Sequence, residues 1–290
     1  MRLVSFDQFR VGVVREQSVL DVTDTVGAPY AGTPYAMNAL IDDFDRLRDR
    51  IEQAADEADA IALADVQLLS PVPAPAQIFA APLNYRKHID EMTGSDIVGD
   101  AFVPGSAAEL GFFLKPPGSL VGASGAIELP DLADREFHHE AELGVVIGKQ
   151  ARAVDSKDAL GHVFGYTCLM DITMRNAPGR SQERVMRKSF ETFTPTGPVL
   201  VTADEVPDPT QLDIELTVNG ESRQKSNTRM LISSVADLIA DTSQVLALGP
   251  GDLIATGTPE GVGPIVPGDV VELSIDQVGV LTMPVTRRSW

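Results

Sequence analysis

Cysteine, long apolar segments and positive charge are all scarce in this sequence. Cys168 is the only cysteine among 290 residues, so the chain can form no internal disulfide and no site built from several thiolates. No run of about 18 apolar residues occurs that could cross a membrane as a helix. The first residues also lack the apolar stretch of a secretory signal. We therefore expect a soluble protein of the cytoplasm.

The scarcity of positive charge bears on the partners of the protein. Lys and Arg number 23 against 42 Asp and Glu, which gives a formal net charge of −19. Such a balance disfavours binding to the phosphates of nucleic acids and to anionic membrane surfaces. We therefore expect neither a nucleic-acid nor a membrane partner, although a site within an acidic protein can still be locally positive.

A proline-rich stretch, SPVPAPAQ at 70–77, divides the sequence into two parts. It is stiff and extended, which is typical of a boundary. Before it, residues 1–24 alternate in the manner of two or three short strands. Residues 38–64 space their apolar side chains as one or two amphipathic surface helices do. We predict a small N-terminal α/β domain over residues 1–70 and a larger domain over 71–290.

The larger part is dominated by strand-like segments. Helices are expected only at 84–92, 155–162 and 233–247, the last with serines that can cap its first turn. The tripeptide PGD occurs at 250–252 and 267–269, and each copy precedes a β-rich run. Runs of strands with few helices argue against a regular alternation of strand and helix. The sequence predicts an α+β fold with a β-rich, mixed-sheet catalytic domain.

Two strand-like segments carry carboxylates opposite an apolar face. In HHEAELGVVIG, residues 138–148, Glu140 and Glu142 share one face, about 7 Å apart if the strand is regular. In FGYTCLMDITMR, residues 164–175, Asp171 lies opposite an apolar row. If the three converge, a hard divalent cation such as Mg²⁺ or Mn²⁺ would offset their repulsion. The alternative is that both glutamates lie on a solvated strand face and that Asp171 is unrelated.

A histidine and a glutamate stand three residues apart in NYRKHIDEM, residues 84–92. On a helix His88 and Glu91 share a face, so the carboxylate can orient the imidazole as a base that activates water. An incidental pair on a surface helix would show the same spacing. The sequence alone leaves both interpretations open.

Two further segments offer groups that could bind an anion. Lys188, in RVMRKSFETFTPTGP at 184–198, could stabilise negative charge that develops on an oxygen. The stretch ATGTPEGVGP at 255–264 presents backbone N–H groups and hydroxyls that can hold a carboxylate or a phosphate. It is not a P-loop, because the Lys-Ser/Thr pair is missing after the glycines. On local evidence a solvated basic loop is the better explanation of the Lys188 segment, and an ordinary connection between strands explains residues 255–264 equally well.

Read in order, these segments resemble the fumarylacetoacetate hydrolase family over roughly residues 75–288. The N-terminal segment also looks like the small leading domain of many bacterial members. The stretches that carry the resemblance are NYRKHIDEM, FFLKPPGSLVG, HHEAELGVVIGK, GYTCLMDIT, RKSFETF, VNGESRQKSNT and GDLIATGTPEGVGP.

The resemblance implies one Mg²⁺ or Mn²⁺ ion per subunit, bound by Glu140, Glu142 and Asp171. His88 with Glu91 matches the family's pair that activates water or relays protons. The expected reaction is hydrolysis of a C–C bond in a 2,4-dioxo acid, of the acylpyruvate or fumarylpyruvate type. It would pass through an enolate that the cation stabilises. Family members are typically homodimers, so we expect a homodimer here.

The resemblance also assigns substrate-facing residues. Lys188 matches a lysine that steadies the enolate or oxyanion, and Thr258, in the GTP motif beside Gly257, matches a threonine that contacts substrate. Gln224, in SRQKSN, falls near a family glutamine, and we expect it to bind substrate. Segment 172–187 should help to form the distal part of the pocket. Its arginines could pair with a second carboxylate of the substrate; they are Arg175, Arg180, Arg184 and Arg187.

Other activities fit the same residues. The enolate chemistry also serves decarboxylation of oxaloacetate and the isomerase/decarboxylase reactions of 2-hydroxyhepta-2,4-diene-1,7-dioate type. A binding protein that keeps the metal without catalysis is a rival from another class. Without the resemblance, a metal-dependent phosphotransfer enzyme is the best alternative, since three carboxylates on strands suit it too, but the absence of a basic groove argues against it. Residues 93–109 are rich in glycine and polar side chains, and we expect them to form a mobile lid.

Overall fold

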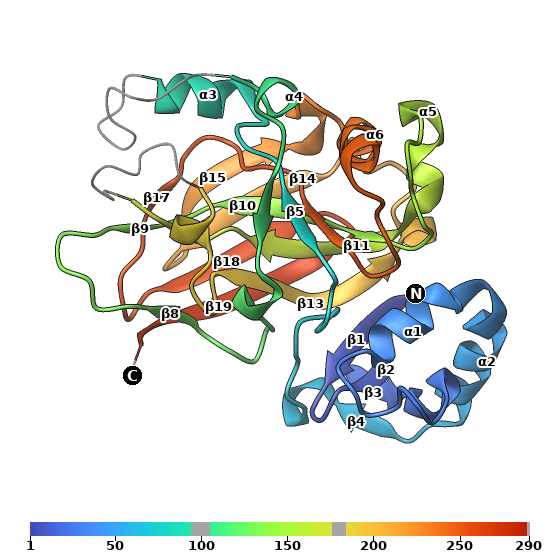
Figure 1. The fold of residues 1–290 in the computed structure, drawn as a ribbon. Coiled ribbons are helices and arrows are strands. Elements are labelled where there is room, and N and C mark those ends of the chain that lie inside the picture. Colours follow the sequence, from blue (N-terminus) through green and yellow to red (C-terminus); the bar gives the residue numbers. More distant parts are fainter. Residues whose placement is uncertain (94–104, 176–183, 289–290) are drawn as a thin grey trace.

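A computed structural model describes residues 1–93, 105–175 and 184–288 of the chain (Figure 1). It is rich in strands, which form three sheets, and its helices are short. This is the β-rich α+β architecture that the sequence predicts. None of the helices in the described ranges has the length and apolar character needed to cross a membrane.

The largest sheet runs from the N-terminal strands into the centre of the molecule. Its neighbouring strands include parallel and antiparallel pairs, so it is a mixed sheet, and β7 (Leu120–Val121) pairs with one of its inner strands, β13. In spatial order its other strands are β4 (Ala60–Ala62), β3 (Ser18–Asp21), β2 (Arg10–Arg15), β1 (Arg2–Phe6), β13 (Thr194–Thr202), β11 (Val163–Met170), β10 (Ala141–Ile147), β16 (Leu253–Ala255), β5 (Ile78–Ala80) and β6 (Phe113–Lys115).

Two helices cover the N-terminal strands. They are α1 (Ala36–Asp42) and α2 (Phe44–Glu57), drawn in blue in Figure 1. Helix α2 buries one residue per turn, from Phe44 to Ala55, as its amphipathic pattern predicts. The predicted helical region 38–64 ends early, because residues after the helix form strand β4 and a 3-10 turn.

The N-terminal part shares a hydrophobic core with the rest of the chain. Strand β1 pairs with β13, so that Leu3 lies opposite Leu200. Both side chains belong to a buried cluster that also takes in Val146 of β10. The rings of Phe44 and Phe164 meet edge to face with centroids 4.8 Å apart. The domain boundary at 70/71 stays a prediction.

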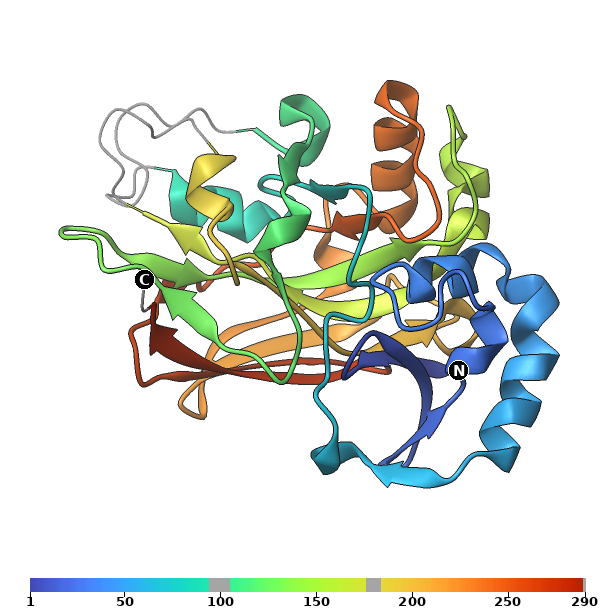
Figure 2. The same ribbon diagram turned by 60° about the horizontal axis from the view of Figure 1, so that its bottom comes forward.

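Two layers enclose the central part of the large sheet (Figure 2). A five-stranded sheet lies against one face, and four short helices lie on the other. The sheet order is β15 (Glu221–Asn227), β14 (Asp213–Val218), β18 (Val270–Ile275), β19 (Gly279–Arg287) and β8 (Ile127–Leu129). The helices are α3 (Arg86–Met92), α4 (Ala107–Leu110), α5 (Ser156–Ala159) and α6 (Val235–Val245).

These helices agree with the sequence pattern. Helix α3 lies within the predicted 84–92, and α5 with the 3-10 turn after it fills 155–162. Helix α6 begins after Ser234, whose side chain forms a capping box with Asp237. The lid predicted over 93–109 lies mostly outside the described residues.

Three strands of the large sheet are interrupted at the same level. Each continues, after a break, into a small three-stranded sheet of order β12 (Thr173–Met174), β9 (Phe137–His139) and β17 (Gly263–Pro264). The single strand expected over 138–148 is therefore two, β9 and β10, with Glu140 between them. Asp171 occupies the matching break between β11 and β12. The pairing between these two segments keeps its register across the break, since Ala141 pairs with Met170 on one side and His138 with Thr173 on the other.

The shared core predicts that the N-terminal part contributes to the stability of the whole chain. Leu3→Ala removes a fully buried side chain between β1 and β13. We expect it to lower the free energy of unfolding by about 2 to 5 kcal/mol, measured by urea denaturation. Leu160→Ala, at a position 41% exposed, is the matched control and should cost about 0.5 kcal/mol or less. An unchanged midpoint for Leu3→Ala would contradict the shared core.

Candidate active site

Three carboxylates meet where the interrupted strands change sheets. Ligand oxygens of Glu140, Glu142 and Asp171 all lie within 4.8 Å of one another. The backbone N–H of Asp171 donates to the carbonyl oxygen of Glu140 over 2.9 Å, which aligns the two breaks. All three side chains are buried, with at most 5% of any residue exposed. The solvated strand face considered for the two glutamates is therefore not what the structure contains.

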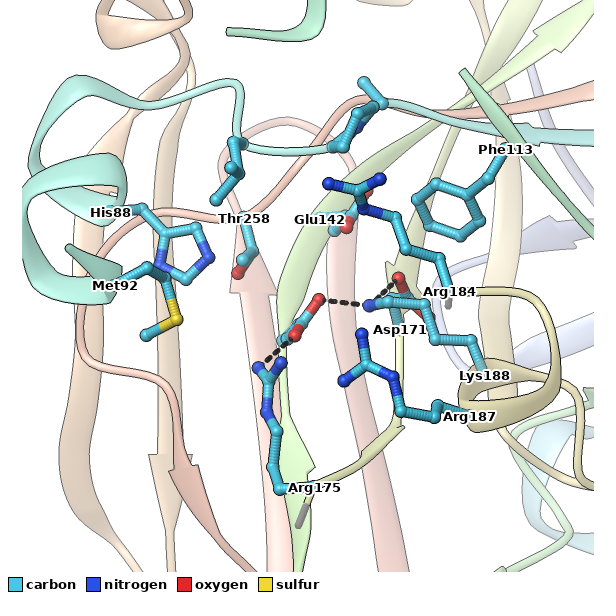
Figure 3. A pocket seen from close by; sticks show the side chains of 14 residues that line it. His88, Met92, Phe113, Glu142, Asp171, Arg175, Arg184, Arg187, Lys188 and Thr258 are labelled. Carbon is cyan, nitrogen blue, oxygen red and sulfur yellow. Dashed lines mark hydrogen bonds and ion pairs between the residues drawn. The ribbon is translucent and has the colours of Figure 1, made fainter. Parts of the chain in front are cut away.

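Three cations surround two of these carboxylates. The Lys188 ammonium donates to Glu140 Oε2 over 2.7 Å and to Asp171 Oδ2 over 2.6 Å. Lys115, itself buried, donates to Asp171 Oδ1 over 2.5 Å. Arg175 donates to Glu140 Oε1 over 2.5 Å. Glu140 and Asp171 are thus neutralised within the protein (Figure 3).

Glu142 has no such partner among the described residues. It accepts one hydrogen bond, from the backbone N–H of Gly257 over 2.6 Å. Burial raises the pKa of Glu142 well above its usual value, and the neighbouring Asp171 and Glu140 charges raise it further. Burial also tends to raise the pKa of Glu140, but Lys188 and Arg175 outweigh it and hold that pKa below its usual value.

This asymmetry fits a site for a hard divalent cation. The cluster offers only carboxylate oxygens, which suit Mg²⁺ or Mn²⁺. Glu142, buried and next to two like charges, is the group whose ionised form most needs a cation. A metal bound by these residues would remove that electrostatic cost.

His88 and Glu91 form the hydrogen bond that their spacing predicts. His88 Nδ1 lies 2.9 Å from Glu91 Oε2 on helix α3, and the other oxygen of Glu91 accepts the N–H of Gly261 over 2.9 Å. His88 is buried and lines the same pocket as the carboxylates (Figure 3). With Nδ1 engaged, Nε2 is the ring nitrogen available to the pocket.

The loop between β16 and β17 places Gly257 and Thr258 at the site. Gly257 has φ +92°, and a Cβ there would come 2.7 Å from the Cβ of Asn84. Glycine at this position lets the backbone turn so that its N–H reaches Glu142. Thr258 lines the pocket beside the carboxylates.

The remaining predicted residues lie in different places. Lys188, on the 3-10 turn Met186–Lys188, and Arg187 both line the pocket. Gln224 does not belong to the described pocket lining: it is buried behind Thr258, and its amide is fully used in hydrogen bonds within the protein. Direct binding of substrate by Gln224 is therefore not what this geometry provides. It was expected because Gln224, in SRQKSN, falls near a glutamine of the family pattern.

The arginines of segment 172–187 divide in the same way. Arg175 pairs with Glu140, so its charge is already used. Arg184 lines the pocket with Arg187, and burial lowers the pKa of Arg184. Arg180 lies outside the described residues. Arg175 also lines the pocket, while Arg184 and Arg187 lie on the side away from His88 (Figure 3).

Lys115 is a site residue that the sequence analysis missed. Burial lowers its pKa, while its ion pair with Asp171 opposes the shift. Its ammonium also donates to the carbonyl oxygens of Lys188 and Phe193. A lysine inside the apolar strand FFLK was the available signal, because a buried lysine requires a partner.

Comparison with known proteins agrees with this architecture. The model of the fumarylacetoacetate (FAA) hydrolase C-terminal family matches residues 77–286. A maleylpyruvate hydrolase from Aquipseudomonas alcaligenes is 41% identical over 289 residues, which cover 98% of this chain and 99% of that protein.

Solved structures resemble the whole chain. A maleylpyruvate hydrolase from Sphingobium sp. SYK-6, in complex with manganese(II) and pyruvate, is 43% identical with a TM-score of 0.86, covering 100% of both chains. A 5-carboxymethyl-2-hydroxymuconate delta-isomerase from Mycobacterium smegmatis is 30% identical with a TM-score of 0.72, again over 100% of both chains. The chain therefore belongs to the fumarylacetoacetate hydrolase family.

Proposed function

We propose that the protein is a divalent-metal-dependent hydrolase that cleaves a C–C bond of an acylpyruvate, a 2,4-dioxo acid. The observation that carries the proposal is the convergence of three buried carboxylates and the His88–Glu91 pair on one pocket. The full-length similarity to two maleylpyruvate hydrolases supports the same reaction class.

Glu140, Glu142 and Asp171 would hold Mg²⁺ or Mn²⁺. When bound, the cation would act as a Lewis acid on the 2-oxo acid end of the substrate and stabilise negative charge there. Lys188, which bonds two of the same carboxylates, would keep part of their charge neutralised. Lys115 and Arg175 would hold Asp171 and Glu140 in place from behind.

His88 would act as the general base. Glu91 holds Nδ1, so Nε2 can take a proton from a water molecule that attacks the C4 carbonyl of the substrate. The C3–C4 bond then breaks, its electrons remain on the pyruvate part as an enolate, and a proton returns to C3. The products are one carboxylic acid and pyruvate. The N–H of Gly261 fixes Glu91 and so keeps the imidazole aimed at the pocket.

Polar groups around the cavity would orient the two ends of the substrate. Thr258 would donate a hydrogen bond to an oxygen at the pyruvate end. Arg184 and Arg187 would attract a carboxylate on the acyl group, because guanidinium groups bind carboxylates through paired N–H donors. We therefore infer a substrate with a second carboxylate, as in maleylpyruvate or fumarylpyruvate.

Isomerase or decarboxylase chemistry on the same scaffold is the second candidate. The specific support is the 30% identity, over the whole chain, to a muconate delta-isomerase. The higher identity to maleylpyruvate hydrolases favours hydrolysis. We further propose, from the family resemblance, a homodimer that works in the cytoplasm and a leading domain over residues 1–70.

The reaction is tested with a substrate panel. Purified protein with Mn²⁺ or Mg²⁺ should convert maleylpyruvate and fumarylpyruvate to pyruvate and a dicarboxylic acid, followed by coupled pyruvate assay and chromatography. Acetylpyruvate, which lacks the second carboxylate, should react with kcat/KM about 10-fold or more lower, since it forms no arginine–carboxylate bonds. Release of CO₂ from oxaloacetate without any hydrolysis would identify a decarboxylase instead.

Glu142→Gln should separate metal binding from folding. Loss of a ligand should weaken Mn²⁺ affinity by about 100-fold or more, since even groups that support ligands matter by about 10- to 100-fold. Because the pKa of Glu142 is raised, its ionisation destabilises the metal-free wild type as pH rises above the usual carboxyl range. The variant should lack that loss of stability in thermal melts. Glu272→Gln, exposed on β18, is the control. Undiminished Mn²⁺ binding would refute the assignment.

His88→Asn should impair chemistry while sparing the metal. We expect kcat to fall by about 100-fold or more, because positioned general bases contribute about that much. Mn²⁺ affinity, measured by calorimetry, should stay near the wild-type value. Asp90→Asn on the exposed side of α3 is the matched control. A His88→Asn protein that hydrolyses maleylpyruvate at the wild-type rate would remove the imidazole from the mechanism.

A further inference from the structure

Gln224 is a buried polar residue on a strand whose neighbours face solvent. It lies on β15 of the five-stranded sheet, 1% exposed, between the exposed Arg223 and Lys225. The loop that carries Thr258 packs directly on this strand. A Cβ at Gly261 would come 2.1 Å from the carbonyl oxygen of Arg223, so no side chain separates them. Gln224 thus reaches the active-site loop from a different sheet.

The amide of Gln224 uses its full hydrogen-bonding capacity. Oε1 accepts from the backbone N–H of Ala141 and from Nδ1 of His139, each over 3.0 Å. Nε2 donates to Thr258 Oγ1 over 2.8 Å and to the carbonyl oxygen of Pro259 over 2.9 Å. The orientation is forced, since the N–H of Ala141 can only donate and the carbonyl of Pro259 can only accept.

This orientation determines the direction of the next hydrogen bond. Thr258 Oγ1 receives an N–H from Gln224, so its own proton must go to an acceptor elsewhere. Among the described residues no acceptor for that proton is found. Thr258 lines the pocket beside Glu142, where the oxygens of a ligand would lie. The hydroxyl is therefore presented to the pocket as a donor.

His139 completes the arrangement. It is fully buried, and within the described chain its Nε2 has no hydrogen-bond partner. Its polar contact is therefore the one that Nδ1 makes with Gln224 Oε1. Because Oε1 can only accept, Nδ1 must carry a proton, and this N–H keeps the amide from turning over.

We propose that Gln224, held by His139, is a positioning residue that makes the Thr258 hydroxyl a hydrogen-bond donor to an oxygen of the bound 2-oxo acid. The proposal rests on the proposed function in one respect, the identity of the ligand. It assigns Gln224 a role that acts through Thr258 and involves no contact with substrate.

A double-mutant cycle tests this dependence in the full-length, metal-loaded protein. Thr258→Val and Gln224→Met each keep side-chain size and remove one partner of the hydrogen bond. Each should lower kcat/KM for maleylpyruvate by about 10-fold or more. The kcat/KM of the double variant should be about the same as that of the less active single variant. Without the Thr258 hydroxyl, Gln224 would have nothing left to orient. If the double variant instead lost kcat/KM by the product of the two single losses, the proposal would be overturned.

Further variants separate positioning from folding. Thr258→Ser keeps the hydroxyl and should retain most activity, and Lys225→Met, on the solvent side of the same strand, should behave as wild type. If Gln224→Met does not fold, Gln224→Glu replaces it. An ionised carboxylate cannot donate, so it would draw the Thr258 proton away from the pocket and give the same loss. A folded Gln224→Glu protein with wild-type kcat/KM would contradict the proposal.

Binding of pyruvate gives a readout that does not depend on turnover. Its affinity, measured by calorimetry on the Mn²⁺-loaded variants, should show the same non-additive pattern, while Mn²⁺ affinity itself stays unchanged. A wild type that binds pyruvate but hydrolyses no acylpyruvate would refute the proposed function alone, and the pyruvate cycle would then decide this inference. A wild type that neither turns over substrate nor binds pyruvate would refute both.

Discussion

The burial of three mutually repelling carboxylates is the constraint on which the rest of this structure depends. Glu140 and Asp171 tolerate burial because cations bond both of them. Within the described ranges Glu142 accepts a hydrogen bond only from a backbone N–H, and burial beside two like charges raises its pKa well above the usual value. The fold thus keeps a buried carboxylate beside two like charges, and a bound divalent cation would offset their repulsion.

The three carboxylates lie together because neighbouring chain segments carry them at the junction of two sheets. Strand β10 begins at this junction, β11 and β16 end at it, and the chain segments on its other side pair in the small sheet of β12, β9 and β17. The backbone hydrogen bond from Asp171 to Glu140 spans the two breaks and keeps both carboxylates at the same level. The loop from Thr256 to Val262 links the carboxylates to the histidine–glutamate pair, because the N–H of Gly257 donates to Glu142 and the N–H of Gly261 donates to Glu91.

Much of this arrangement could be predicted from local patterns. Alternation placed Glu140 and Glu142 on one side of an apolar strand, and the spacing of His88 and Glu91 predicted their contact. The break at Glu140 was not predictable, because a strand that changes sheets keeps the same alternation of side chains. Lys115 was missed for a similar reason: its partner Asp171 lies 56 residues away in the chain.

The sequence by itself determined the types of group and their local geometry: the three carboxylates on strand-like segments, the histidine–glutamate pair and the glycine that permits a tight turn. Those features depend on neighbours within a few residues. Only the tertiary structure decided which groups meet and which way each hydrogen bond runs. Gln224 shows the difference, since the direction of its amide depends on Ala141 and Pro259, which other parts of the chain supply. Such long-range pairing leaves no periodic trace in the sequence, and so the fold alone settles it.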